Sequence, residues 1–352
     1  MNGSASPRPG LREVGPYDSP QLDVQARLNT NECPLPLPDA FADDLAAAVR
    51  EVALNRYPDG GMRELRGALS AHTGHPADGI WPANGSNEVL TQLLQAYGGP
   101  DRRAALFEPT YLLHRRLCWL THTAIEDRRL EAPFELREED VAWAAATGAD
   151  VVFVCSPNNP TGTAQPLDTI RSIADAVDAL VVVDEAYVDF GGRTALPLVG
   201  DHPNVAVVRT FSKSFALAGA RIGYVLAAPE VIGDLERVRL PYHLSALTQA
   251  AGVVALRHAA EAAGAVEAIR AERDRILTAL AGIDGMTVHP SEANFVLFEP
   301  PGDAQEVWRG LLDRGVLVRD LTAVVPNALR VTAGTPHEVD LFLKSLEEVL
   351  AS

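Results

Sequence analysis

The chain has 352 residues, of which 30 are Lys or Arg and 47 are Asp or Glu, so its formal net charge is −17 at pH 7. This balance argues against nucleic acid as the main partner, because phosphate backbones are bound by basic faces. No stretch reaches the roughly 18 apolar residues of a membrane span, and the N-terminal residues lack the apolar core of a signal peptide. The three cysteines lie far apart without CxxC spacing, so we expect neither a zinc site nor disulfides, but a cytoplasmic protein.

The N-terminal part of the chain is expected to be an arm followed by extended chain. Residues 1–10 are rich in Ser, Pro and Gly and predict a flexible arm. The prolines between 34 and 38 disfavour helical backbone in the residues before them. Apolar side chains at helical spacing then predict a helix over 39–52, and a second one is expected over 62–73.

Another helix is expected to begin directly after Gly85, with Ser86 and Asn87 in its first turn. A helix start of this kind presents free N–H groups and the positive end of the helix dipole to an anion. Ser and Asn are also ordinary capping residues, and by itself this motif is better explained by capping.

Buried strands and helices alternate through the middle of the chain. The apolar runs end in short polar segments and are joined by short links; they lie at 104–107, 151–155, 180–183 and 205–208. This alternation predicts an α/β fold with a doubly wound, mostly parallel sheet, in a large domain over residues 45–245. Asp184 and Tyr187 follow one of these strands, at the edge where such sheets bind their ligands.

The last third of the chain has a different pattern. A long Ala-rich helical region over 248–281 is followed by strands near 293–298, 316–319 and 329–332 and by a final helix. We expect a smaller α+β domain over residues 246–352, and the N-terminal residues 1–44 are expected to contribute an arm and part of this smaller domain.

Lys213 leaves the apolar strand at 205–208 between two serines. A lysine in this position can be partly desolvated, which lowers its pKa and makes the amine available for Schiff-base chemistry. Ser212 and Arg221 can bind a phosphate dianion. An isolated Ser-Lys pair is more often a solvated surface lysine, and Tyr111 alone is more often a core aromatic residue.

Together these pieces match the requirements of an aldehyde cofactor with a pyridine ring and a phosphate. Such a cofactor needs an imine-forming lysine, a carboxylate at the ring nitrogen, donors at the phenolate oxygen, an aromatic stack and a phosphate-binding helix start. The candidate residues are Lys213, Asp184, Tyr187, Asn159, Tyr111, Gly85, Ser86, Asn87, Ser212 and Arg221.

From about Gly15 to the final helix, the sequence resembles the fold-type I pyridoxal-phosphate aminotransferases, and within them the histidinol-phosphate aminotransferases. The family motifs are Ser-Pro-Asn-Asn-Pro-Thr-Gly at 156–162, Val-Val-Val-Asp-Glu-Ala-Tyr at 181–187 and Arg-Thr-Phe-Ser-Lys-Ser-Phe at 209–215, followed by Ala-Gly-Ala-Arg-Ile-Gly at 218–223. The motifs of the narrower branch are Leu-Asn-Thr-Asn-Glu-Cys-Pro at 28–34, Arg-Tyr-Pro-Asp-Gly at 56–60, Leu-Pro-Tyr-His-Leu-Ser at 240–245 and Leu-Arg-Val-Thr-Ala-Gly-Thr-Pro at 329–336.

The resemblance implies a role for each cofactor residue. Lys213 would carry pyridoxal 5'-phosphate as an imine and move the substrate proton, and Asp184 would pair with the ring nitrogen. Asn159 and Tyr187 would hydrogen-bond the phenolate oxygen, and Tyr111 would stack on the ring. The phosphate would be bound by Ser86, Asn87, Ser212, Arg221 and, from the other subunit of a homodimer with shared active sites, Tyr57.

The resemblance also implies substrate contacts. Arg330 matches an arginine that binds a substrate carboxylate in most relatives, and in the narrower branch it would bind a substrate phosphate together with Arg319. For Arg319, an ordinary surface ion pair is an equally good interpretation. Tyr17 resembles a tyrosine of a mobile segment that closes over the substrate, Asn31 belongs to the same entrance, and Asn159 is expected to contact substrate as well as cofactor.

The reaction implied is the reversible conversion of histidinol phosphate and 2-oxoglutarate to imidazole-acetol phosphate and glutamate in histidine biosynthesis. Four features depart from the family pattern: Cys33, His114, the pair Arg115-Arg116, and Val339. We expect them to affect substrate identity and not cofactor chemistry. The alternatives are therefore an aromatic or specialised-metabolite transaminase, a threonine-phosphate decarboxylase-like enzyme, or a pyridoxal-phosphate oxidase.

Overall fold

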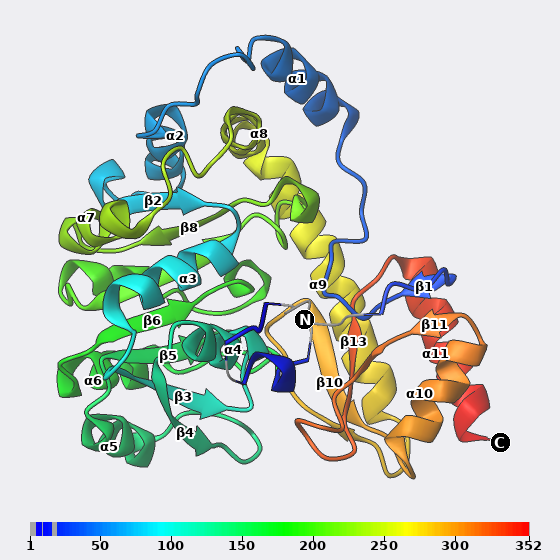
Figure 1. Ribbon diagram of the computed structural model, residues 1–352. Helices are drawn as coiled ribbons and strands as arrows, with labels where there is room; N and C mark the ends of the chain where they lie inside the picture. The colour runs from blue at the N-terminus through cyan, green and yellow to red at the C-terminus, as the bar shows by residue number, and fades with distance from the viewer. Residues whose placement is uncertain (1–4, 9, 16–19, 352) are drawn as a thin grey trace.

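The computed structural model describes residues 5–8, 10–15 and 20–351. Its larger part is built on a seven-stranded sheet with the order β2-β8-β7-β6-β5-β3-β4 (Figure 1). The strands are β2 (Ile80–Ala83), β3 (Arg103–Glu108), β4 (Ala124–Arg129), β5 (Val151–Cys155), β6 (Leu180–Asp184), β7 (Val205–Thr210) and β8 (Gly223–Leu226). Only β8 runs antiparallel to its neighbours, while the pairs from β7 to β4 are parallel, which confirms the predicted mostly parallel α/β sheet.

The central strands are buried along their whole length because they are covered on both faces. All five residues of β5 and all five of β6 are buried, and these strands consist almost entirely of Val, Leu and Phe. Such continuous apolar runs are typical of parallel strands between two helical layers. The helices of this part are α1 (Asp39–Arg50), α2 (Arg63–Thr73), α3 (Ser86–Tyr97), α4 (Leu112–Leu120), α5 (Glu138–Thr147), α6 (Leu167–Ala176), α7 (Pro229–Val238) and α8 (Ala246–Arg257).

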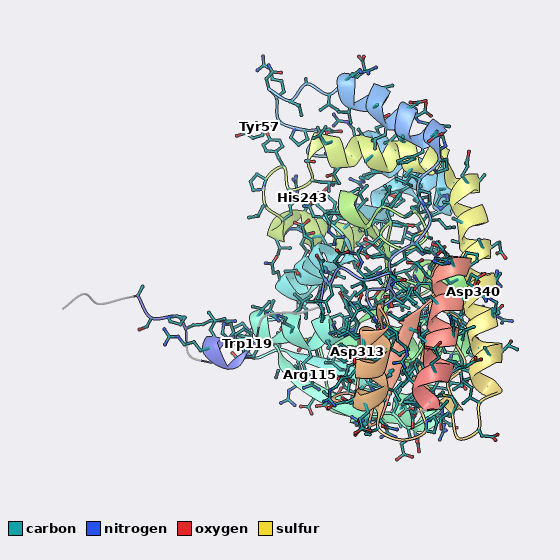
Figure 2. All side chains as sticks on the ribbon, turned by 90° about the vertical axis from the view of Figure 1, so that its right-hand side faces the viewer. Tyr57, Arg115, Trp119, His243, Asp313 and Asp340 are labelled. Carbon is teal, nitrogen blue, oxygen red and sulfur yellow. The ribbon has the colours of Figure 1, made fainter. Side chains whose placement is uncertain are left out.

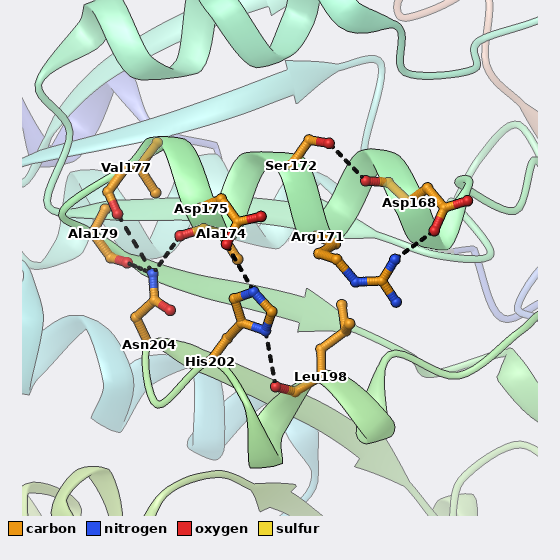
Figure 3. Close-up of polar contacts among 10 residues, drawn as sticks. All are labelled: Asp168, Arg171, Ser172, Ala174, Asp175, Val177, Ala179, Leu198, His202 and Asn204. Carbon is orange, nitrogen blue, oxygen red and sulfur yellow. Dashed lines mark hydrogen bonds and ion pairs between the residues drawn. The ribbon is translucent and has the colours of Figure 1, made fainter.

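Side-chain to backbone hydrogen bonds hold α6, β6 and β7 in register (Figure 3). Asn204, in the turn before β7, donates from Nδ2 to the carbonyl oxygens of Ala174, Val177 and Ala179 at 3.0, 3.5 and 3.2 Å. One side chain thus satisfies carbonyl groups at the end of α6 and in the connection to β6. Because β6 is only five residues long, this connection also determines where Asp184 emerges at its carboxyl end.

The smaller part contains a four-stranded antiparallel sheet with the order β12-β13-β10-β9. Its elements are β9 (Thr287–Val288), β10 (Phe295–Glu299), β12 (Arg319–Asp320), β13 (Leu329–Thr332), α9 (Ala259–Ala281), α10 (Ala304–Asp313) and α11 (Pro336–Leu350). The N-terminal strand β1 (Ala26–Arg27) pairs in parallel with β11 (Val316–Leu317). This pairing attaches β1 to the smaller part.

Two separate apolar cores underlie these two parts. The first surrounds the large sheet and includes residues of α8, while the second joins β1, β10, β13, α9 and α11. The domain boundaries at 44 and 245 stay a prediction. Short 3-10 helices complete the described structure, at Leu11–Glu13, Ala77–Gly79, Val188–Phe190, Leu196–Gly200 and Ala218–Ala220. Within the described ranges, no helix has the length and apolar character needed to cross a membrane.

The structure differs from the sequence-based expectation at the long Ala-rich helix, which is interrupted at His258. There α8 ends at Arg257 and α9 begins at Ala259. The His258 ring bonds through Nε2 to Asp44 of α1 at 2.9 Å and packs edge-on against Phe41. This tertiary contact separates α8, which packs on α1, from α9, which extends to the smaller sheet (Figure 1).

Candidate active site

A cavity of about 480 Å³ lies at the carboxyl ends of β5, β6 and β7, whose last residues Cys155, Asp184 and Thr210 all line it. Residues of β12 and β13 contribute to its wall, so the cavity is shared by both parts of the chain. Twelve of the residues that the sequence singles out line it: Asn31, Ser86, Asn87, Tyr111, Asn159, Asp184, Tyr187, Ser212, Lys213, Arg221, Arg319 and Arg330. Gly85 is the residue before Ser86 in the chain and is not itself among the lining residues. Tyr57 does not line the cavity, and Tyr17 lies outside the described residues.

Lys213 has an amine with an unusually low affinity for protons. Its Nζ donates to the carbonyl oxygen of Asn31 at 2.8 Å and to that of Thr30 at 3.2 Å. Burial, with the added positive charges of Arg330 and Arg221, lowers the pKa of Lys213 to about 7. A substantial fraction of this amine is therefore neutral near pH 7, which is the form that attacks a carbonyl carbon.

Asp184 is buried at the end of β6 and is contacted by a histidine that the sequence did not connect with it. His114 Nε2 lies 3.1 Å from Asp184 Oδ2, and the backbone N–H of Ala186 donates to Oδ1 at 3.2 Å. His114, which the sequence connected only with substrate identity, is therefore in contact with a predicted cofactor residue. The fully buried His114 ring stacks on Phe153 with centroids 4.7 Å apart.

The sequence contained a signal for this contact, because His114 follows Tyr111 by three residues at the start of α4. Residues at this spacing in a helical turn project from the same side. Tyr111 meets the His114 ring edge-on, with centroids 5.6 Å apart, and both side chains are held near the cavity. The predicted cofactor contact of Tyr111 could therefore have indicated that His114, one helical turn later, also lies near the cofactor residues.

Tyr187 presents its hydroxyl to two asparagines. Asn31 Nδ2 donates to it at 3.0 Å, and Asn159 Nδ2 does so at 3.5 Å. Burial raises the pKa of Tyr187 to about 12, so the hydroxyl keeps its proton at neutral pH. Asn159 is itself fixed by Arg330, whose Nη1 donates to its Oδ1 at 2.5 Å.

The start of α3 forms an anion site together with Arg221. Gly85 precedes this 12-residue helix with φ of 81°, and a Cβ at Gly85 would lie 2.6 Å from Arg221 Nη2. Glycine therefore permits both the positive φ and the close approach of the guanidinium. Arg221 Nη1 donates to Ser212 Oγ at 3.2 Å. A guanidinium, a hydroxyl and free N–H groups of a helix start are the donors that suit a phosphate.

A second pair of cationic side chains enters the cavity from the smaller sheet. Arg319 of β12 and Arg330 of β13 are direct register partners, so their side chains lie on the same face. Arg330 Nη2 also donates to the carbonyl oxygen of Asn29 at 2.9 Å. This pair suits a second anionic group, separate from the one at Arg221.

Tyr57 lies on the surface, where the structure does not bring it to the cavity. It is 80% exposed and stacks on Tyr242 with ring centroids 4.5 Å apart. Figure 2 shows Tyr57 at the same edge of the molecule as His243. Further contributors that the sequence reasoning missed are Thr30 and Thr332, which bind Lys213 and Asn31. Among the described residues, no group of acidic, His and Cys side chains suits a metal ion.

Fold and cavity together place the chain in a known class. The aminotransferase class I and II family matches residues 23–346, and the chain belongs to this family. At 47% identity it is similar to the histidinol-phosphate aminotransferase of Frankia casuarinae, over 97% of this chain and 90% of that protein. The corresponding protein of Mycolicibacterium smegmatis is 48% identical over 97% of this chain and 93% of its own length. The resemblance drawn from the motifs is thereby confirmed.

A solved structure has the same fold. The histidinol-phosphate aminotransferase of Sinorhizobium meliloti, determined in complex with pyridoxal-5'-phosphate, superposes with a TM-score of 0.88. The alignment covers 100% of this chain and 99% of that one at 24% sequence identity. This likeness establishes the fold-type I architecture for the present chain.

Proposed function

We propose that this protein is a pyridoxal-phosphate-dependent aminotransferase that converts histidinol phosphate and 2-oxoglutarate to imidazole-acetol phosphate and glutamate, reversibly, in histidine biosynthesis. The observation that carries this proposal is that one cavity holds a lysine with lowered pKa and two separate cationic sites. One site, at Arg221, suits a cofactor phosphate, and the other, at Arg319 and Arg330, suits a substrate phosphate. The similarity to named histidinol-phosphate aminotransferases supports the same reaction.

The residues present fit pyridoxal phosphate. We assign its phosphate to the start of α3 with Ser86, Asn87, Ser212 and Arg221, a set that already arranges donors around the Gly85 backbone. Tyr111 is available to stack on the ring. When bound, the cofactor supplies an aldehyde and an electron-withdrawing ring that weakens the bonds to the substrate Cα.

Two side chains of this protein would control protons during the reaction. Lys213, with a pKa of about 7, can bond to the cofactor as a neutral amine and, once displaced by substrate, can take up or return the Cα proton. Asp184 would keep a proton on the ring nitrogen, because an ionised carboxylate stabilises a cation beside it. His114 holds that carboxylate in place by donating from Nε2.

Substrate binding would use the small-domain arginines. A guanidinium offers paired N–H donors that match phosphate geometry, and two of them suit a dianion. Arg330 would also bind the carboxylate of glutamate in the second half-reaction. Asn159 couples to this site because its Oδ1 is bonded to Arg330. Asn31 contacts Tyr187 and Lys213 instead of the arginines, so we assign it to the cofactor side of the cavity.

A homodimer with shared sites is part of the proposal. The exposed Tyr57 and Tyr242 form a stacked aromatic pair on one edge of the molecule. Aromatic side chains are enriched at protein interfaces, and this pair would be buried by a second copy of the chain, with Tyr57 reaching the partner's cofactor phosphate. The three cysteines are free thiols, which supports the expected cytoplasmic location.

A single-turnover half-reaction tests the proposal. The cofactor-loaded protein is mixed with histidinol phosphate alone, and the visible absorbance of the cofactor is followed. We expect rapid conversion to the amine form and recovery of the original spectrum on adding 2-oxoglutarate. Conversion only by an aromatic or other amino acid would identify a different transaminase. Release of carbon dioxide from threonine phosphate, or of peroxide, would identify a decarboxylase or an oxidase.

A further inference from the structure

Asn31 connects the N-terminal segment to both Tyr187 and Lys213. It is 1% exposed and has φ of 56°, a left-handed conformation that Asn tolerates better than most residues. Its carbonyl oxygen accepts from Lys213 Nζ at 2.8 Å and from Asn294 Nδ2 at 3.2 Å. Its side chain reaches Tyr187 in the other direction, so one buried residue contacts both groups.

The direction of the Asn31 amide is determined by Thr332. The backbone N–H of Asn31 can only donate, and it does so to Thr332 Oγ1 at 3.1 Å. The Thr332 hydroxyl accepts this bond with a lone pair and donates its own proton to Asn31 Oδ1 at 3.0 Å. With its oxygen bonded to Thr332, the Asn31 amide must present Nδ2 to Tyr187. Hydrogen bonds thus run in one direction, from Thr332 through Asn31 to the Tyr187 hydroxyl.

Arg330 determines the second asparagine in the same way. A guanidinium has no acceptor, so the Asn159 atom that faces Arg330 must be oxygen, and Nδ2 faces Tyr187. Arg330 and Thr332 are two residues apart in β13 and lie on the same face of that strand. One small strand therefore orients both amides that meet the Tyr187 hydroxyl.

This arrangement leaves one direction for the Tyr187 proton. A hydroxyl has a single donor and two acceptor lone pairs. Both amides donate to the oxygen, so the proton points away from them, toward the cavity that Tyr187 lines. The phenolic oxygen of the proposed cofactor is the acceptor that this proton suits.

We propose that Asn31, oriented by Thr332, is a positioning residue for two groups: its amide directs the Tyr187 proton toward the cofactor's phenolic oxygen, and its carbonyl holds the Lys213 amine whenever that amine is not bonded to the cofactor. This inference rests on the proposed function, because it assigns a partner to the cofactor lysine. The Thr30 carbonyl completes the holding site for the amine.

Several charged groups also act on the two positioned side chains. Arg330 of β13 and Arg221 repel the Lys213 ammonium, and Glu32 attracts it. The charge of Arg330 lowers the pKa of Tyr187, and Cys155 and Asp184, at the ends of β5 and β6, raise it. All of these groups are retained when only Asn31 or Thr332 is changed, so those substitutions isolate the side-chain hydrogen bonds of these two residues.

The chain offers matched variants for a test. Asn31→Gly keeps the left-handed backbone and the backbone carbonyl and removes only the side-chain amide. Thr332→Val removes only the hydroxyl, which Thr332→Ser retains. Asn327→Gly is the control, since Asn327 also has a left-handed backbone (φ of 57°) and makes three side-chain hydrogen bonds, to Pro300, Gly302 and Ala304. Lys344, the only other lysine and an exposed one, is an internal reference for amine labelling.

Two readouts are compared. In the holoenzyme, the pH midpoint of the cofactor's visible absorbance should rise by about one unit in Asn31→Gly and in Thr332→Val, because a weaker hydrogen bond stabilises the charged phenolic oxygen less. In the cofactor-free protein, the pH midpoint of Lys213 acylation, read by mass spectrometry against Lys344, should stay where it is in Asn31→Gly, because the carbonyl oxygen that accepts from the amine belongs to the backbone and is retained. Thr332→Ser and Asn327→Gly should leave both midpoints where they are.

An unchanged absorbance midpoint in the Asn31→Gly holoenzyme, a shifted acylation midpoint in cofactor-free Asn31→Gly, or an equal absorbance shift in Asn327→Gly would overturn the inference. Failure of the proposed function looks different. In that case borohydride reduction of the wild-type holoenzyme would not attach the cofactor to Lys213, whereas acylation of the cofactor-free protein would still report the protonation of the Lys213 amine. Should Thr332→Val not fold, the comparison of Asn31→Gly with Asn327→Gly decides the matter.

Discussion

The two walls of the cavity are built in different ways. The carboxyl edge of the large sheet contributes Asp184, the last residue of β6, and Lys213, which lies three residues after β7; both are held by a rigid scaffold of buried parallel strands. The opposite wall combines Asn31 with β12 and β13, which are brought together by contacts across about 300 residues of sequence. The first wall suits chemistry that is common to a whole family, and the second suits adjustment of the substrate and of the cofactor's hydrogen bonds.

The largest effect is expected on the first wall. Lys213→Ala should lower the half-reaction rate by about 10⁴-fold or more and prevent covalent attachment of the cofactor, because no other lysine is among the described residues that line the cavity. Stopped-flow absorbance measures the rate. Lys344→Ala, which removes the only other lysine, should leave it unchanged. Substantial turnover in the Lys213 variant would disprove the assignment of the nucleophile.

Asp184→Asn should retain cofactor binding and lose about 10³-fold in rate, because a neutral amide no longer stabilises a protonated ring nitrogen. Single-turnover kinetics and a cofactor titration separate the two properties. The matched control is Asp175→Asn, since Asp175 also pairs with a histidine, His202, but at the surface of α6 (Figure 3). If both variants react at the wild-type rate, Asp184 does not act on the ring.

On the second wall, Arg319→Ala should slow the half-reaction of histidinol phosphate about 10- to 100-fold, because a charged hydrogen bond to the phosphate is lost. The half-reaction with glutamate, which has no phosphate, should change by less than about threefold. Arg309→Ala, an exposed arginine of α10, serves as control. Equal losses with both substrates would mean that Arg319 does not bind the substrate phosphate. The second wall would then not be specialised for substrate recognition.

Substitutions of His114 test whether a residue buried behind Asp184 also contributes to the rate. His114→Phe keeps an aromatic ring next to Phe153 but removes the donor to Asp184, and we expect about a tenfold loss in kcat with little change in KM. His114→Gln, which can still donate, should recover part of the rate. An unchanged kcat and an unchanged pH profile in His114→Phe would show that the contact is structural only.

The same division explains what could be predicted from the sequence. The residues of the first wall follow apolar runs within short motifs, so strand ends and local spacing were enough to group Asp184, Asn159 and Lys213. The Thr332–Asn31 contact has no local signal in the sequence, because the two residues meet only when the fold places β1 and β13 near each other. The polar edge strand β4, Ala-Ile-Glu-Asp-Arg-Arg, was missed because it has no buried apolar run.

The smallest expected effect concerns stability and follows from the Lys213 amine. Its pKa is about 7 in the folded chain and near the ordinary value of 10.5 in the unfolded chain. Between these values the unfolded state binds more protons than the folded state, so the free energy of unfolding of the cofactor-free protein rises with pH, by at most about 1.4 kcal/mol per unit from this group. Lys213→Met lacks this dependence.

The measurement is the difference in Tm between cofactor-free wild type and Lys213→Met at pH 7 and at pH 9. We expect wild type to gain a few degrees relative to the variant over this range, because all other titrating groups are shared and cancel in the difference. A difference that stays constant would mean that Lys213 is protonated with an ordinary pKa in the folded chain. The carbonyl groups of Thr30 and Asn31 would then outweigh burial, and the amine would need another group to remove its proton before it could react.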